Sequence, residues 1–507
     1  MYSDILPMLR DPQLSDENFT RLFEDCSACV VLLGREVKPF VEVICDVTWL
    51  NRNDDLVALY SKFLLNLVTA HPYYTPLVMA SLMKNLKVGG ENWDENPPEE
   101  LIFKWSNVHT IIAQIIAIMP MSSTILMQNI VEQFPYYKLG SYCNRAYVYN
   151  LIWVTKYIPA LQEQIITAII NRLVVMDVNM VDKSRKQSIQ NEAIFSMEID
   201  DDETVISETL DFCMLEMLQW LQDERDSAMN VLCNVFERVI LPTHGIRHVQ
   251  FLILYIISIN QQCADRILTN LWMMAAGCNG LGPGALATRK TAASHLAGLL
   301  ARCIRIPNTR LIQFLRNMAD WCHSYITATQ EAATASENVK VHGAFHAICH
   351  AIFYLVAFKH QHLFMNKTNI NFIQSLNLSR LVTCVLNPLK TCPPQVIRAF
   401  SSVTRAHQVV YCQAIIERNA RQSIVTEANA HYDEWFPYDP YTLPKSGEII
   451  WPLCIDYKDW LQEGDDETQY SSMMKKLEDD DDYLMTSPKS KIASSLSNCI
   501  SPGFKSM

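Results

Sequence analysis

Glycine is scarce in this chain, and the shortage argues against a fold built from β-sheet. Only 14 of the 507 residues are glycine, whereas an average protein contains about 7%. Sheet proteins need many tight turns, and tight turns need glycine at positions with positive φ. No stretch alternates apolar and polar residues for long enough to predict a strand. The composition therefore favours helices joined by short connections.

The chain also has no long apolar run. The longest, residues 251–259, is less than half as long as the 20 or so residues that a membrane span needs, so we expect no membrane partner. Residues 1–10 lack a basic start followed by an apolar stretch, which indicates no secretory signal. The 16 cysteines are accordingly expected to be free thiols in a reducing compartment.

Charged residues make up only 19% of the chain and apolar residues 49%, which is ample material for a large core. The net charge of −12 is concentrated in two acidic runs, at residues 198–203 and 478–482, and the rest is close to neutral. Autonomous nucleic-acid binding depends on many Lys and Arg side chains that neutralise phosphates. We therefore expect contact with DNA to be weak at most.

Helical periodicity is the main positive feature, and it extends from about residue 16 to 421. Apolar residues recur at helical spacing in the segment Leu56, Leu59, Tyr60, Phe63, Leu64 and Leu67. Pro72, Pro120 and Pro159 interrupt the pattern at intervals typical of HEAT or armadillo helix pairs. The sequence predicts an all-α fold, a HEAT-like helical-repeat solenoid over residues 1–462. An irregular helical bundle is the alternative.

Three segments differ from this helical body. Residues 181–203 combine a small basic cluster with an acidic run, which predicts a mobile acidic surface loop. The glycine-rich stretch 277–284 predicts a flexible turn between helices. Residues 463–507 become acidic and then rich in Ser and Lys, the composition of a disordered tail.

Motifs that carry chemistry are incomplete. Cys26 and Cys29 form a CxxC without a second pair, and we interpret them as two thiols buried on a helix. The stretch 277–284 lacks the Gly-Lys-Ser/Thr ending of a phosphate loop. Three histidines stand four residues apart on one expected helix: His342, His346 and His350. We interpret these histidines as residues that pack between helices, with a metal site as the less favoured alternative. We therefore expect no metal, no cofactor and no enzyme activity.

Several serines lie in contexts that kinases recognise. Ser188 follows a basic pair, Ser184 lies in the same cluster, and Ser487 and Ser501 each precede a proline. A phosphate would add nearly two negative charges to segments that are already acidic. We expect regulatory kinases to use such sites and to loosen a partner.

Three sequence blocks are distinctive. They are Arg-Val-Ile-Leu-Pro-Thr-His-Gly at 238–245 with His-Val-Gln-Phe at 248–251, Leu-Asn-Pro-Leu-Lys at 386–390 with Ile-Glu-Arg-Asn-Ala-Arg-Gln at 416–422, and Phe-Pro-Tyr-Asp-Pro-Tyr at 436–441. In this order they resemble the family of RNA polymerase I-specific transcription initiation factors. Shorter matches fall at 65–68, 130–135, 177–179 and 483–484, whereas the first fifty residues match poorly.

The resemblance implies a stack of HEAT-like helix pairs that binds RNA polymerase I, makes it competent to initiate, and connects it to the promoter selectivity complex in the nucleolus of the nucleus. It also implies docking on the polymerase through serines in the N-terminal half, for which Ser122, Ser123 and Ser141 are the candidates. The residues themselves suggest a second surface, a basic strip of Lys390, Arg398 and Arg405 that would meet an acidic partner or promoter DNA. A solvated helix face is the plainer reading of this strip.

Two other classes of function remain open. A generic HEAT-type scaffold or nuclear transport adaptor would share the helical repeats without the polymerase. An enzyme that uses the face of His342, His346 and His350 would contain a stoichiometric metal.

Overall fold

The structure is a computed structural model that describes residues 15–87, 92–180, 199–278, 286–332, 339–423, 437–438 and 440–457. Over these ranges the secondary structure is helical, with one isolated β-bridge between Cys303 and Cys454. The prediction of an all-α fold is confirmed. The chain groups into two compact units, unit 1 (Met1–Val235) and unit 2 (Phe236–Met507). The predicted tail at 463–507 lies outside the described residues.

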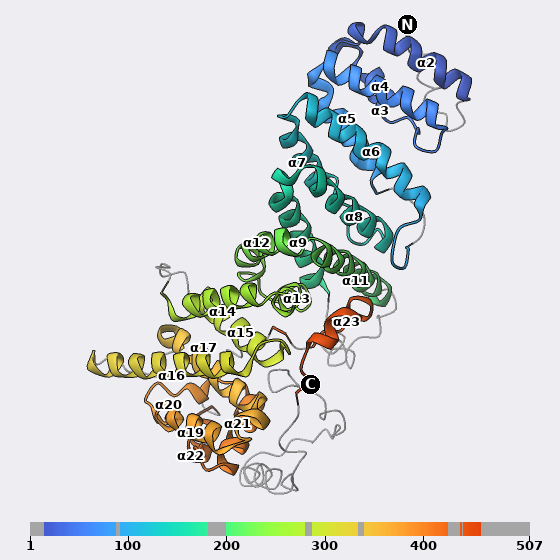
Figure 1. The fold of residues 1–507 in the computed structure, drawn as a ribbon. Coiled ribbons are helices and arrows are strands. Elements are labelled where there is room, and N and C mark those ends of the chain that lie inside the picture. The colour runs from blue at the N-terminus through green and yellow to red at the C-terminus, as the bar shows by residue number, and fades with distance from the viewer. Residues whose placement is uncertain are drawn as a thin grey trace, which may run out of the picture. The chain divides into compact units, whose positions relative to one another are not determined.

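Unit 1 consists of successive helix pairs that form two rows. The first row contains α2 (Asp16–Ala28), α4 (Asp54–Ala70), α6 (Glu99–Ile118), α8 (Ser141–Tyr157) and α11 (Ile199–Asp223). The second row contains α3 (Lys38–Cys45), α5 (Thr75–Asn85), α7 (Ser122–Glu132), α9 (Gln162–Asn179) and α12 (Arg225–Val235). Each helix contacts the next in its row, and from α4 onward each first-row helix contacts its pair partner (Figure 1). This stacking of repeats confirms the expected HEAT-like arrangement.

Prolines mark the turns inside these pairs. Pro72 lies in η3 (Pro72–Tyr74) between α4 and α5, and Pro159 lies in η4 (Pro159–Leu161) between α8 and α9. Pro120 follows α6 and precedes α7. Proline lacks the backbone donor that would continue a helix. The three prolines occupy equivalent places, so their spacing in the sequence is the spacing of the repeats.

Helix α4 illustrates how the sequence forms these elements. The side chain of Asn53 accepts a hydrogen bond from the Leu56 amide at 3.0 Å and caps the helix. Asp54 and Asp55 follow in the first turn, where the helix dipole favours negative charge. One face is buried, and it comprises Leu56, Val57, Tyr60, Phe63, Leu64, Leu67 and Val68. Burial of each large apolar side chain contributes about 1.5–3 kcal/mol.

The acidic run after residue 198 belongs to a helix. The prediction of a loop extended to residue 203, but α11 begins at Ile199, so that boundary was wrong. Residues 200–202 of the acidic run fall in the first turn of α11. Residues 181–198 lie outside the described part of the chain.

Unit 2 packs around one apolar helix, α17 (Val339–Phe358), which contacts α14, α15, α16, α18, α21 and η7. The π-helix η5 (Phe236–Ile240) precedes the other elements of the unit. These are α13 (Phe251–Ile259), α14 (Gln261–Ala276), α15 (Leu286–Arg302), α16 (Asn308–Glu331), α18 (His360–Leu363), α19 (Lys367–Ser375), α20 (Leu378–Thr383), η7 (Pro388–Lys390), α21 (Pro394–Ala406), α22 (Gln413–Ser423), α23 (Pro444–Ile450) and η8 (Trp451–Leu453).

Among the residues that the structure describes, two helices are as long and apolar as membrane spans, although neither is an uninterrupted apolar run. They are Glu99–Ile118 and Val341–Phe358. In the second, 94% of the apolar window is buried, because helices of unit 2 surround α17. In the first, 33% is buried, and α6 contacts α4, α5, α7 and α8. The composition of α17 is thus that of a core helix.

The first and third distinctive sequence blocks pack on each other in unit 2. His248 Nε2 forms a hydrogen bond of 2.8 Å with Thr442 Oγ1. The ring of Phe251 meets the ring of Tyr441 edge-on, with centroids 4.7 Å apart. Residues almost 200 positions apart in the sequence therefore pack against each other.

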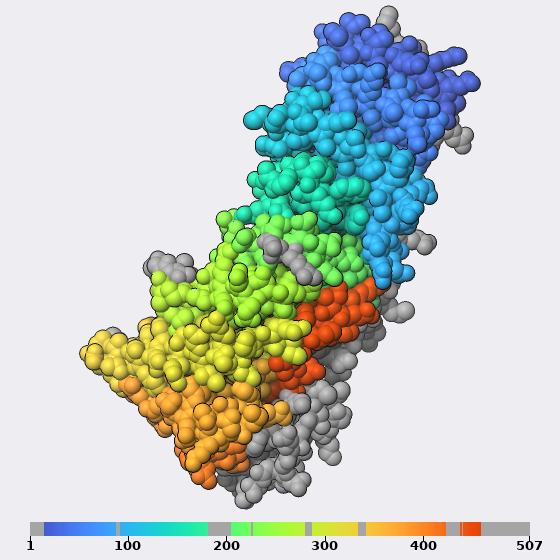
Figure 2. Space-filling view, in the orientation of Figure 1, coloured from blue at the N-terminus to red at the C-terminus, as the bar shows by residue number. Residues whose placement is uncertain are grey.

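Arg302 forms hydrogen bonds near both ends of the segment 437–457. Its Nε donates to the carbonyl of Tyr438 at 3.1 Å, and its Nη1 donates to the carbonyl of Ile455 at 2.8 Å. The Ile455 amide in turn donates to the carbonyl of Arg302 at 2.7 Å. Figure 2 shows the later part of this segment, coloured red, on the surface of the molecule.

Candidate docking surfaces

The three histidines of α17 have structural partners. His346 Nε2 lies 2.8 Å from the carbonyl oxygen of Leu386, and His350 Nε2 lies 2.9 Å from that of Pro388. Burial lowers the pKa of His346 to about 4 and of His350 to about 3, so both rings are neutral and donate through Nε2. His342 Nδ1 hydrogen-bonds the hydroxyl of a tyrosine on α16 at 2.9 Å. This geometry favours helix packing over the metal interpretation. In the part of the chain that the structure describes, no three His, Cys, Asp or Glu side chains are grouped so that they could hold a metal ion.

Asn387 joins the two halves of the second sequence block. Its amide nitrogen donates to Asn419 Oδ1 at 2.8 Å, and Asn419 donates back to Asn387 Oδ1 at 3.1 Å. Asn387 has a φ of 47°, in the left-handed region that asparagine tolerates better than most residues. The segment 386–390 is thus held by α17 on one side and by α22 on the other, and Lys390 ends it.

Lys390, Arg398 and Arg405 are all exposed. Arg398 and Arg405 stand seven residues apart on α21, and this spacing places them on the same face of the helix. The opposite face of α21 packs on α17, where the rings of Phe400 and Phe353 lie 4.5 Å apart. The two arginines of the basic strip therefore project from a helix whose other side is fixed by the core.

The sequence contains a signal for this surface that the analysis of motifs missed. No Asp or Glu occurs between Glu337 and Glu417, whereas Lys and Arg recur throughout that stretch. The basic residues of this acid-free stretch are Lys340, Lys359, Lys367, Arg380, Lys390, Arg398 and Arg405. In a chain whose net charge is −12, the lack of acid makes this part of unit 2 locally positive.

The three candidate docking serines do not form one exposed surface. Ser122 is 3% exposed and Ser141 is 7% exposed, whereas Ser123 is half-buried. Ser141 Oγ accepts a hydrogen bond of 2.6 Å from Asn92 Nδ2. Ser122 and Ser123 begin α7, whereas Ser141 begins α8, 18 positions after Ser123.

Apolar side chains are exposed beside Ser123. Met121, in the connection between α6 and α7, is 82% exposed, and Ile118, the last residue of α6, is 50% exposed. Neither was singled out in the sequence, because a single exposed apolar residue cannot be distinguished from a core residue by pattern alone. Together with Ser123 they form an uncharged exposed corner of unit 1.

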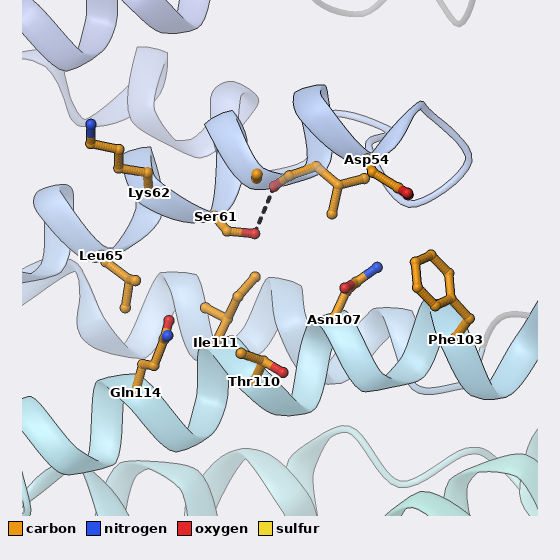
Figure 3. Close-up of a pocket in the computed structure, with 11 residues that line it drawn as sticks. Asp54, Ser61, Lys62, Leu65, Phe103, Asn107, Thr110, Ile111 and Gln114 are labelled. Atoms are coloured by element: carbon orange, nitrogen blue, oxygen red, sulfur yellow. Dashed lines mark hydrogen bonds between the residues drawn. The ribbon is translucent and has the colours of Figure 1, made fainter.

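A shallow groove of about 490 Å³ lies between α4 and α6. Figure 3 shows Leu65 of α4 pointing toward the side of α6 that carries Ile111 and Gln114, whereas Lys62 points away from α6. Ser61 Oγ donates to a backbone carbonyl of its own helix at 2.7 Å. The lining contains no histidine or cysteine.

Some predicted features fall outside this picture. The candidate phosphorylation sites lie outside the described residues: Ser184, Ser188, Ser487 and Ser501.

Cys26 is buried, but Cys29 is exposed because α2 ends at Ala28, so the prediction of two buried thiols was wrong for Cys29. Gly277 ends α14 with a φ of 79°, the left-handed cap that glycine favours.

The arrangement defines a class of protein, an all-α protein built from HEAT-like helical repeats. The family model of the "RNA polymerase I specific transcription initiation factor RRN3" matches residues 2–212 and 204–462. The chain belongs to this family of RNA polymerase I-specific transcription initiation factors, as the sequence blocks predicted.

Individual proteins agree with the family match. The RNA polymerase I-specific transcription initiation factor RRN3 of Mus musculus is 27% identical over 536 residues, which cover 94% of this chain and 81% of that protein. The factor rrn3 of Schizosaccharomyces pombe is 24% identical and covers 85% of this chain and 78% of its own length. The fold resembles the crystal structure of RNA polymerase I transcription initiation factor Rrn3, with a TM-score of 0.73, 17% identity, and coverage of 89% of this chain and 93% of that one.

Proposed function

We propose that this chain is an adaptor that binds RNA polymerase I, makes it competent to initiate, and connects it to the promoter-bound selectivity complex at ribosomal RNA genes. The observation that carries the proposal is the family match, which extends over nearly all of the described chain. An adaptor needs two faces that bind at once, because one attachment raises the effective concentration for the other. This role requires neither catalysis nor a cofactor. An adaptor of this kind acts in the nucleus and nucleolus.

We assign polymerase docking to unit 1, near Ser122, Ser123 and Ser141. Ser123 is the one of the three that adjoins exposed apolar surface, at Met121. Ser122 and Ser141 are buried and would contribute by holding the starts of α7 and α8 in place. An uncharged corner of this kind fits a partner whose contact surface is also weakly charged, and a phosphate or carboxylate introduced there would need a counter-charge that the corner does not offer.

We assign the selectivity complex to the basic strip of unit 2. Lys390, Arg398 and Arg405 are exposed in a stretch of sequence without acidic residues, which favours an acidic protein partner through complementary charge. Promoter DNA would add at most a weak contact, since the whole chain is acidic. Regulatory kinases acting on Ser184, Ser188, Ser487 or Ser501 would weaken a partner by adding negative charge.

Capture from nuclear extract tests the proposal. Tagged protein should retain RNA polymerase I and not polymerases II or III, and Ser123→Glu should abolish this capture while Ser123→Ala retains it. Failure of the unmodified protein to capture polymerase I, before and after phosphatase treatment, would favour the generic HEAT-type scaffold or transport adaptor.

The second surface is tested by charge reversal. The triple variant Lys390→Glu, Arg398→Glu and Arg405→Glu should lose the selectivity complex and keep polymerase I. A matched triple variant outside the acid-free stretch of unit 2 changes the net charge equally at exposed positions: Arg266→Glu, Arg305→Glu and Arg316→Glu. Equal losses in both variants would mean that net charge, and not the strip, governs binding.

A further inference from the structure

Two buried thiols meet between α16 and α17. Cys322 Sγ lies 3.8 Å from Cys349 Sγ, and both side chains are fully buried. The two helices pack against each other and are consecutive in the chain. A disulfide has a sulfur–sulfur distance of about 2.05 Å, so the sulfurs need to approach by a little less than 2 Å.

The surroundings of the pair determine how it can react. Burial raises the pKa of the Cys349 thiol, and the neighbouring Cys322 raises it further. The Cys349 thiol is therefore protonated at neutral pH and reacts slowly with bulky reagents, because the thiolate is the nucleophile and access is closed. Cys384 is half-buried, and Cys384 and Cys392 are near enough to influence Cys349 electrostatically. A small uncharged oxidant is the reagent that suits such a site.

We propose that Cys322 and Cys349 form a modification site, a dithiol that hydrogen peroxide converts into a disulfide between α16 and α17. One sulfur attacks a peroxide oxygen, which breaks the O–O bond, releases water and leaves a sulfenic acid. The second sulfur attacks the first, the S–S bond forms, and the hydroxyl leaves as water with the second thiol's proton. Two thiols and one peroxide thus give one disulfide and two waters.

The position of Cys349 allows a movement caused by the modification to affect the surface of unit 2. The next residue, His350, donates to the carbonyl of Pro388, in the segment that ends at Lys390. Movement of α17 at Cys349 therefore reaches the basic strip. An effect on the selectivity complex rests on the proposed function, whereas formation of the disulfide does not.

Peptide mapping of the full-length protein tests the site. Reduced native protein is titrated with hydrogen peroxide, the remaining thiols are alkylated after denaturation, and linked peptides are identified by mass spectrometry. We expect a Cys322–Cys349 link in native protein, and no preference for it when the protein is oxidised in concentrated urea. Cys322→Ser should abolish the link, while Cys213→Ser, at a fully buried thiol of unit 1, should retain it.

Melting gives a second measurement that does not depend on the variants. Oxidised wild-type protein should melt at a higher temperature than reduced protein, because the link restricts the unfolded chain. Oxidation confined to exposed thiols such as Cys29 and Cys278, or a link from Cys349 to Cys384 or Cys392, would overturn the proposal. If the link forms and binding of the selectivity complex is unchanged, the site stands and only its effect on the strip is wrong.

Discussion

Gly298 shows how one residue can be fixed by a distant one. It lies on α15 against the ring of Tyr438, and a Cβ built at this position would be 2.7 Å from Tyr438 Cδ2. The ring cannot easily retreat, because the Tyr438 hydroxyl hydrogen-bonds His295 Nδ1 at 3.1 Å and Arg302 binds the carbonyl of Tyr438. Glycine at 298 is therefore required by close approach, since its φ is not in the left-handed region.

We expect Gly298→Ala to destabilise unit 2. Overpacking of a core usually costs about 1–3 kcal/mol, and the better helix propensity of alanine offsets about 1 kcal/mol of this. The variant should have a lower midpoint of chemical denaturation than the wild type. Gly34→Ala is the matched control, because a Cβ there meets nothing within 4 Å. Equal midpoints for both variants would show that Tyr438 can move without cost.

Buried histidines predict a loss of stability in mild acid. Burial lowers the pKa of His109 and His346 to about 4, and of His295 and His350 to about 3. An unfolded histidine titrates near 6.5, so below that pH the unfolded state binds more protons than the folded state. Stability is therefore complete above about pH 6.5 and falls as the pH drops toward the folded pKa values, by about 1.4 kcal/mol per pH unit for each histidine.

The measurement is denaturant unfolding at pH 7 and pH 5. The wild type should lose stability over this interval, and His350→Gln should lose less, because glutamine can donate to Pro388 without titrating. His244→Gln, at an exposed position, should behave like the wild type. A slope that His350→Gln leaves unchanged would contradict the assignment of a neutral, buried imidazole.

At the scale of elements, a buried ion pair fixes α11 to α8. Arg145 Nε donates to Glu216 Oε1 at 2.6 Å, and both side chains are almost fully buried. Arg145 also donates to the carbonyls of Trp93 and Asp94, in the segment that precedes α6. Burial raises the pKa of Glu216, while Arg145 acts in the opposite direction. Three segments of unit 1 therefore converge on one guanidinium group.

Removing one partner of this pair should be costly. Arg145→Met or Glu216→Leu alone leaves an uncompensated buried group, which typically costs about 3–5 kcal/mol. The double variant should lose less than the sum of the two single variants, and a double-mutant cycle of unfolding free energies measures the difference. Glu100→Gln, which breaks the exposed pair with Lys104, should change little. Additive losses would show that the two groups do not depend on each other.

These elements also show what the sequence can predict. The period of α4 and the prolines at 72, 120 and 159 are local signals, and they predicted the helices and turns of unit 1. The burial of Ser122 and Ser141 depends on contacts between helices, which no local pattern records. The start of α11 was misplaced because a run of acidic residues is typical of both a loop and a first helical turn.

At the scale of the molecule, charge is distributed unevenly along the chain. Helix α11 of unit 1 is rich in Asp and Glu, whereas residues 338–416 of unit 2 contain neither. The candidate polymerase corner at Ser123 belongs to unit 1, and the basic strip belongs to unit 2. The two surfaces differ in chemistry, so variants of one need not disturb the other.

Bridging requires both surfaces on the same molecule, and this requirement gives a prediction for mixed variants. Ser123→Glu alone should fail to retain the polymerase, and the Lys390→Glu, Arg398→Glu, Arg405→Glu variant alone should fail to recruit it to the promoter. An equimolar mixture of the two should also fail in promoter-dependent transcription, because neither chain raises the local concentration of one partner near the other. Each variant should keep the melting temperature of the wild type, since both changes are at the surface. Restored transcription in the mixture would mean that the two surfaces act on separate molecules or within an oligomer, and the single-chain adaptor would have to be abandoned.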